Sequence, residues 1–169
     1  MQDISKYVNK ALELGADHAV RFNTGQIVFD SRTLIKCMFG CTDYGFGHTC
    51  PSRSGSLRPW EYEKIFSKYE CGVIIHSTSK KISQDISYEV ERQAFHDGNY
   101  FAFSLSDCTL CAECMGFKGK VCAFPMKARP AFHSVGIDVF ATVQQFDLPI
   151  NVLLSKDHVT NWYSAVFVY

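Results

Sequence analysis

Hydrophobic residues recur every three to four positions in three stretches of the chain, and this is the spacing of one face of an α-helix. The stretches cover residues 3–14, 58–69 and 83–96. Pro59 stands in the first turn of the second stretch, and Ser83 stands at the start of the third. Because proline and serine favour the first positions of helices, these residues support the boundaries. The pattern therefore predicts three helices.

Shorter apolar stretches predict strands, which in globular proteins are usually about five or six residues long. Runs of this kind cover residues 71–77, 100–105 and 162–169. Residues 18–22 and 26–30 alternate between apolar and polar positions, and the Asn-Thr-Gly sequence between them is typical of a turn. We therefore expect these last two segments to pair as a hairpin.

Helical and strand patterns follow one another along the chain, with further short helices expected over residues 126–135 and 138–146. This order is typical of the α/β or the α+β class, and we expect helices to cover a mixed sheet. Residues 36–58 and 115–126 contain cysteines but no periodicity, which predicts two cysteine-rich loops between the regular elements. No linker or repeat interrupts the chain, so residues 1–169 are expected to form a single domain.

The chain carries 17 basic and 17 acidic side chains, so its formal net charge at pH 7 is zero. This neutrality argues against a dedicated binder of nucleic acid or of anionic membranes. No apolar stretch approaches the roughly 18 residues of a membrane span, and the first residues lack the apolar stretch of a secretory signal. We therefore expect a cytoplasmic protein without nucleic-acid or membrane partners. In a reducing compartment its eight cysteines are expected to be metal ligands or catalysts rather than disulfides.

The densest cysteine motif is formed by Cys108, Cys111 and Cys114 at successive two-residue gaps, with Cys122 downstream and Pro125 just beyond. Bacterial ferredoxins begin their cluster-binding run with the same spacing. Such a spacing lets a short loop wrap one face of a [4Fe–4S] cluster. Structural zinc usually takes paired cysteines or cysteine–histidine sets, and three evenly spaced cysteines leave the middle one awkward for one tetrahedral ion. The motif predicts a [4Fe–4S] cluster, with zinc or unligated redox-active thiols as alternatives.

A second motif precedes it, with Cys37, Cys41 and Cys50 in a glycine-rich stretch. Three thiolates cannot fill the four iron corners of a cubane cluster, so a fourth ligand is missing. Cys71 or His48 could supply it, as could a cysteine of the other motif, since two-cluster ferredoxins exchange ligands in this way. The fourth iron could also stay open and bind a substrate atom as a Lewis acid. Cys71 is better explained as a small buried hydrophobe, because it stands at the start of an apolar strand.

The charge around both motifs favours an anionic cofactor. Residues 31–58 carry four basic side chains and one acidic one, and residues 107–129 carry four basic and two acidic ones. A [4Fe–4S] cluster with four thiolates is an anion, and neighbouring cations stabilise both the thiolates and the reduced state.

Taken together, the two motifs resemble those of a family of small prokaryotic proteins that are described as predicted metal-binding proteins of unknown function. The resemblance covers most of the chain from about residue 32 onward and rests on Lys36-Cys37, Gly40-Cys41, Tyr44-Gly45 and Cys50-Pro51, and then on Cys108, Leu110-Cys111, Cys114, Cys122, Pro125, Ala128-Arg129-Pro130 and Gly136-Ile137-Asp138-Val139. Two positions depart from the family pattern: Ser52 stands where a second proline is usual, and Ala123 where arginine is frequent. The resemblance implies metal binding and no particular reaction.

Our leading hypothesis is an iron–sulfur protein with one or two [4Fe–4S] clusters, which transfers single electrons to or from a redox partner protein or has a redox accessory role. The expected ligands of one site are Cys108, Cys111, Cys114 and Cys122, and those of the other are Cys37, Cys41 and Cys50.

Two alternatives remain open at the level of the sequence. One is an enzyme that uses an open iron at Cys37, Cys41 and Cys50, with substrate contacts from Arg32, Arg53 and His48. The other is a zinc-stabilised interaction module without redox chemistry. Neither the presence of enzyme activity nor the oligomeric state follows from the pattern.

Overall fold

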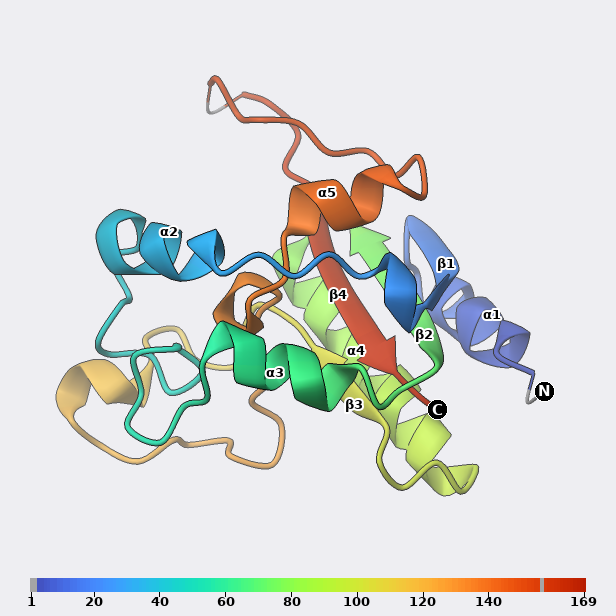
Figure 1. The fold of residues 1–169 in the computed structure, drawn as a ribbon, viewed down its shortest axis with the longest axis horizontal. Coiled ribbons are helices and arrows are strands. Elements are labelled where there is room, and N and C mark those ends of the chain that lie inside the picture. The colour runs from blue at the N-terminus through green and yellow to red at the C-terminus, as the bar shows by residue number, and fades with distance from the viewer. Residues whose placement is uncertain (1–2, 156) are drawn as a thin grey trace.

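A computed structural model describes residues 3–155 and 157–169, and its centre is one four-stranded sheet (Figure 1). The strands lie in the order β1-β2-β4-β3. Their bounds are His18–Asn23 for β1, Cys71–Ser77 for β2, Phe103–Leu105 for β3 and Trp162–Phe167 for β4. All three pairings are antiparallel, so the fold belongs to the α+β class and the expected mixed sheet is corrected.

The position of β4 explains this correction. The segment from β2 through the following helix to β3 forms a β-α-β unit, which by itself favours two neighbouring parallel strands. The C-terminal strand β4 instead lies between β2 and β3 and pairs with both of them in antiparallel orientation. β2 and β3 run in the same direction but are therefore not neighbours.

Helices cover both faces of the sheet. One face carries α1 and α4, with the bounds Ser5–Glu13 and Lys80–His96. The other face lies under α3 and α5, with the bounds Pro59–Phe66 and Val139–Gln144. Helix α2 is nine residues long and spans Arg32–Gly40. It lies beside the short 3₁₀ helix η3, His133–Val135. Two further 3₁₀ helices, η1 and η2, span Thr24–Gln26 and Met115–Lys118.

Alternate residues of the strands supply two separate hydrophobic clusters, as the two-residue period of a strand requires. Ile74 of β2 belongs to the cluster under α3 and α5, whereas its neighbours Val73 and Ile75 belong to the cluster under α1 and α4. All seven residues of β2 are buried. This explains why residues 71–77 read as an uninterrupted apolar run, and the predicted strand is confirmed.

The predicted hairpin of residues 18–22 and 26–30 is wrong. β1 pairs with β2, and the chain that follows β1 forms the 3₁₀ helix η1 instead of a hairpin turn. The backbone N–H of Asn23 donates a hydrogen bond to Oε1 of Gln26 at 2.8 Å, which closes this turn. Ile27 then enters the core, and Phe29 makes only an isolated bridge with Ile137.

The helix predicted over residues 83–96 begins earlier than expected, at Lys80. Ser79 caps it, because its hydroxyl accepts a hydrogen bond from the backbone N–H of Ile82 at 3.4 Å. Ser83 lies inside the helix, and its buried hydroxyl bonds that of Ser164 on β4 at 2.9 Å. The earlier start matters because it brings the N-terminal end of α4 to the cysteine-rich loops. No helix within the described residues has the length and apolar character needed to cross a bilayer.

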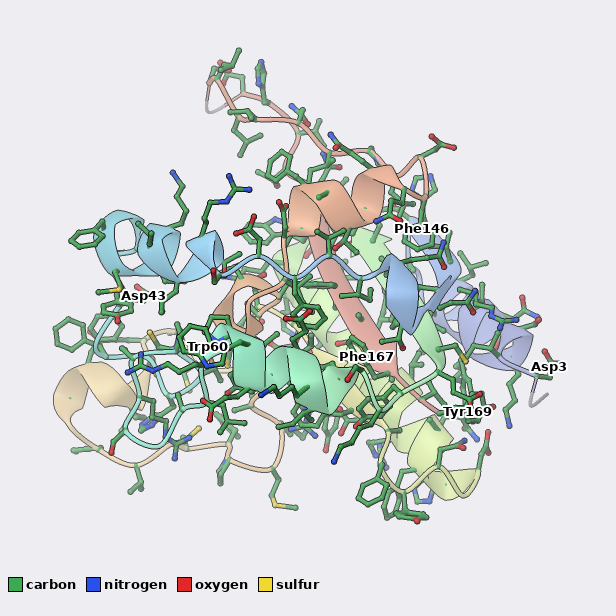
Figure 2. The ribbon with its side chains drawn as sticks, in the orientation of Figure 1. Asp3, Asp43, Trp60, Phe146, Phe167 and Tyr169 are labelled. Carbon is green, nitrogen blue, oxygen red and sulfur yellow. The ribbon has the colours of Figure 1, made fainter. Side chains whose placement is uncertain are left out.

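The cysteine-rich loops gather at one end of the molecule. In Figure 1 the segments around residues 41–58 and 108–128 lie together, away from both termini. Asp43 marks this end in Figure 2, while Asp3 and Tyr169 lie at the opposite side. The sheet and its helices thus form a support, and the loops that project from it carry six of the eight cysteines.

Gly72 on β2 provides a test of the close packing between strands. A Cβ atom added there would lie 2.1 Å from the carbonyl oxygen of Val166 and 2.5 Å from the ring of Phe22. We expect Gly72→Ala to lower the free energy of unfolding by at least about 2 kcal/mol, because neither the strand backbone nor the packed ring can move away cheaply. The measurement is urea unfolding followed by circular dichroism.

Gly25→Ala is the matched control, since an added Cβ there meets no atom within 4 Å. Equal unfolding midpoints for the two variants would contradict the packing described for β2.

Candidate metal centre

The first cysteine motif begins on a helix and continues into a series of turns. Cys37 lies on α2 and is buried, Cys41 follows its last residue and is exposed, and Cys50 is half-buried. The three thiols line one cavity of about 180 Å³. Burial raises the pKa of Cys37 to about 11, and the nearby Cys41 and Cys50 add to this shift. The expectation that residues 36–58 form only loop is therefore corrected at α2.

The second motif surrounds a larger cavity. Cys108, Cys111, Cys114 and Cys122 all line one space of about 450 Å³. Cys108 is exposed and the other three are half-buried. The pKa of Cys111 is raised, first by desolvation and then by the nearby thiols of Cys108, Cys114 and Cys122. The structure therefore brings together the four cysteines that the sequence groups.

The two cavities share a wall. Cys108 lines both of them, together with Lys80, Asp43, Gly47 and Thr49. Lys80 is the first residue of α4, so the positive end of that helix also faces this wall. The two cysteine sets are thus neighbours, with one cation placed between them.

The two loops interlock at three points. The rings of Phe46 and Phe117 stack with their centres 5.1 Å apart. Nε2 of His48 donates a hydrogen bond to the carbonyl oxygen of Lys120 at 2.7 Å. Gly116 approaches the other loop so closely that an added Cβ would lie 1.8 Å from the carbonyl oxygen of Phe46. Only glycine fits at this crossing.

Helix α4 holds the first part of the second loop. Oε1 of Gln84 accepts hydrogen bonds from the backbone N–H and the hydroxyl of Thr109, at 2.8 and 2.6 Å. Gln84 is only 2% exposed, so this contact lies within the protein interior. The residue next to Cys108 is thereby fixed to the helix.

The end of the same loop is held two helical turns further along. The carboxylate of Glu91 forms a nearly buried ion pair with Arg129, whose Nε donates to Oε2 at 2.8 Å. The backbone N–H of Ser104 on β3 donates to the same oxygen at 2.8 Å. A buried carboxylate requires such partners, and here they join α4, β3 and the end of the loop.

Ser52, one of the two departures from the family pattern, contacts a cysteine directly. Its hydroxyl donates to Sγ of Cys50 at 2.9 Å and accepts from the backbone N–H of Gly45 at 2.8 Å. A proline at this position could do neither. The hydroxyl of Ser52 thereby links the sulfur of Cys50 to the backbone of the turn at Gly45.

Neither of the two single residues considered for a fourth ligand of the first site takes that position. Cys71 is buried on β2, belongs to the cluster under α1 and α4, and lines neither cysteine cavity. This placement fits the small buried hydrophobe. His48 lines the cavity of the four-cysteine set and not that of the three-cysteine set.

Other donor side chains do line the three-cysteine cavity: Asp43, Asp107, Cys108 and His133. The sequence reasoning missed Asp107 and His133 as candidates. Asp107 directly precedes Cys108, and that adjacency could have marked it. His133 lies more than 80 residues from Cys50 in the sequence and reaches the cavity only because η3 packs against α2.

The arginines proposed as substrate contacts at the first site lie elsewhere. The guanidinium of Arg32 is 82% exposed and pairs with Asp30. Arg53 and His48 line a third cavity, next to Cys122 of the other cysteine set. The structure therefore does not bring these residues together at the three-cysteine site.

Within residues 3–155 and 157–169, no three histidine, cysteine, aspartate or glutamate side chains converge closely enough to hold a metal ion. The thiols nevertheless surround common cavities, so they are soft donors spread around a space rather than gathered at one point.

Comparison with known proteins places the chain in a family. The family described as "Predicted metal-binding protein (DUF2284)" matches residues 20–168, and the chain belongs to it. No curated protein and no solved structure matches the chain. The resemblance noted from the cysteine motifs is thus confirmed, together with metal binding as the predicted property of the family.

Gly116 tests whether the crossing of the loops supports metal binding. We expect Gly116→Ala to lose most of the bound metal while the sheet stays folded, because the added methyl group would push the two loops apart at Phe46. The measurements are metal content by mass spectrometry and circular dichroism of the purified protein. Gly40→Ala is the control, since its Cβ would meet no atom within 4 Å although it adjoins Cys41. Full metal content in both variants would show that the crossing is irrelevant to binding.

Proposed function

We propose that this member of the DUF2284 family holds [4Fe–4S] clusters in its two cysteine sets and transfers single electrons to or from a redox partner protein. The observation that carries the proposal is the arrangement of Cys108, Cys111, Cys114 and Cys122 around one cavity of about 450 Å³. Four cysteines with this spacing are the usual ligands of such a cluster.

The spread of the thiols favours a cluster over zinc. Each Zn–S bond is about 2.3 Å long, so four thiolates on one zinc ion lie within about 4 Å of each other. Thiolates that bind four different iron atoms lie farther apart, around the corners of the cluster. A set that lines a common cavity without converging on one point agrees better with the second arrangement.

The first cysteine set would hold a second cluster. Cys37, Cys41 and Cys50 supply three thiolates around their own cavity, and a fourth donor is available among the side chains on its wall. Asp43 faces both cavities, and its backbone carbonyl already accepts hydrogen bonds from Phe46 and Gly47. Within the described residues the ring of His133 forms no hydrogen bond, which leaves its nitrogens available.

The clusters would supply reversible one-electron oxidation and reduction. The protein residues would hold the thiolates in place and control their surroundings. Ser52 donates a hydrogen bond to Cys50, and Lys80 places a positive charge at the wall that both cavities share. Cations and hydrogen bonds near a cluster stabilise its reduced, more negative state.

The position of the two sets agrees with electron transfer through the protein to a partner. Cys108 belongs to the wall between the cavities, so electrons would pass between neighbouring sites over a short distance. Cys41 and Cys108 are exposed, which would bring a docked partner protein close to the metal. All eight cysteines are free thiols, a state that a reducing cytoplasm maintains.

The first test is the metal and sulfide content of protein purified without oxygen. Two clusters predict about eight irons and eight sulfides per chain, and one cluster predicts about four of each.

Cys111→Ala should abolish the absorbance and the electron paramagnetic resonance signal of one cluster, because it removes one of four thiolates. Cys71→Ala should leave both unchanged, since Cys71 lines neither cavity.

Stoichiometric zinc without sulfide would overturn the proposal and favour a zinc-stabilised interaction module. Full retention of iron and spectrum in Cys111→Ala would remove the ligand assignment.

Lys80 allows a second test, with the neighbouring lysine as its control. Lys80→Gln should shift the reduction potentials of both clusters to more negative values, because the variant removes the cation at the shared wall. Lys81→Gln removes the same charge one residue away. Both lysines form an ion pair, Lys80 with Asp107 and Lys81 with Asp85, but Lys81 lines neither cavity. Redox titrations followed by electron paramagnetic resonance measure both variants. Equal shifts would mean that only the net charge of the protein matters.

A further inference from the structure

A third cavity, of about 680 Å³, lies directly beside the four-cysteine set and is separate from the space that the thiols enclose. Cys122, His48 and Thr49 line both cavities, so they form the wall between them. The volume lies within the range of about 300 to 1,000 Å³ that is typical of small-molecule sites. Nothing in the proposed electron transfer uses this space.

The cavity has one apolar side and one polar side. Tyr62 and Phe66 of α3 and Phe103 of β3 contribute aromatic rings, and Pro125 and Pro130 add further apolar surface. The opposite side comes from residues 48–56, a segment that contributes hydroxyl groups and one guanidinium. The lining thus offers both apolar surface and polar groups, and a site that orients a small organic molecule needs both.

The charged side chain in the lining indicates which charge a bound molecule would carry. Arg53 lies on the polar side, and none of the described residues that line the cavity is an aspartate or a glutamate. Among the residues that the structure describes, Arg53 forms no ion pair. Its Nη1 donates to the carbonyl oxygen of His48 at 3.2 Å, and the other N–H groups of the guanidinium form no hydrogen bond to a described residue. A guanidinium without a carboxylate partner favours a carboxylate or a phosphate.

The polar side is held in place by its connection to the first cysteine set. The backbone N–H of Arg53 donates to the carbonyl oxygen of Cys50 at 3.1 Å, and Ser56 N–H donates to the carbonyl oxygen of Arg53 at 3.0 Å. His48 in turn binds the Lys120 carbonyl on the other loop. Arg53 therefore projects from a turn whose backbone is tied to both loops.

We propose that this cavity binds a small organic anion with a planar apolar body, such as an aromatic carboxylate or phosphate. Arg53 binds the anionic group, and the aromatic side contacts the apolar body. The bound molecule lies next to Cys122 and so beside the metal that the four cysteines hold. This assignment moves the substrate contacts Arg53 and His48 from the three-cysteine site, where the sequence suggested them, to the four-cysteine site.

The test measures binding of two probes, benzoate and phenyl phosphate, by isothermal titration calorimetry on the full chain purified without oxygen. Saturable binding of either anion supports the site, and the preferred probe identifies the anionic group. Benzamide, a neutral analogue of benzoate, should bind at least about tenfold more weakly, because it cannot form an ion pair with Arg53. Absence of saturable binding for both anions would overturn the proposal.

Arg53→Gln should weaken binding of the preferred anion at least about tenfold, and Arg53→Lys should recover part of it, because lysine keeps the charge without the planar fork. Arg92→Gln is the matched control, since Arg92 pairs with Glu89 on the outer face of α4 and does not line the cavity. Unchanged affinity in Arg53→Gln, or an equal loss in Arg92→Gln, would contradict the assignment.

The result is independent of whether the metal is an iron–sulfur cluster. Arg53 lines the anion cavity but not the four-cysteine cavity, so Arg53→Gln should lose the anion and keep the iron, the sulfide and the cluster absorbance. In the wild-type protein the bound anion should also alter the resonance signal of the cluster beside Cys122. Binding without any iron would refute the electron-transfer proposal alone, whereas iron without binding would refute the anion site alone.

Discussion

The carboxylate of Glu91 is the group on which the arrangement of the loops depends. A carboxylate that is nearly buried must be paired, because an uncompensated charge in the interior costs several kcal/mol. Glu91 meets this requirement with Arg129 from the end of the second loop and with Ser104 on β3. One side chain of α4 thereby joins three segments that are distant in the sequence. Seven residues earlier on α4, Gln84 accepts a hydrogen bond from the backbone N–H of Thr109 and so fixes the beginning of the loop.

This anchoring decides where the cysteines lie. With the beginning of residues 108–129 fixed at Gln84 of α4 and the end at Glu91, the loop between them meets the first cysteine loop. Phe46 and Phe117 stack, and Gly116 admits the backbone of the other loop. The two cysteine sets become neighbours whose cavities share Cys108 and Lys80 in their lining.

The same crossing of loops creates the cavity that carries Arg53. Its polar side continues the first cysteine loop, its apolar side is the sheet and α3, and Cys122 belongs to the wall toward the metal. Electron transfer and anion binding would therefore use different surfaces of one structural unit. Their proximity would allow a bound molecule to influence the cluster, or to react beside it, without entering the space that the thiols enclose.

The sequence by itself determined the elements whose pattern is local. The strand at residues 71–77, the helix near residues 59–66 and the grouping of the cysteines into two sets follow from periodicity and spacing, because neighbours along the chain set them. Only the tertiary structure decided how β4 separates β2 from β3, why residues 26–30 leave β1, and how His133 reaches the first cysteines. These features depend on contacts between segments far apart in the sequence, and their energies come from burial and pairing in the folded state. A local pattern of apolar and polar residues does not predict such contacts.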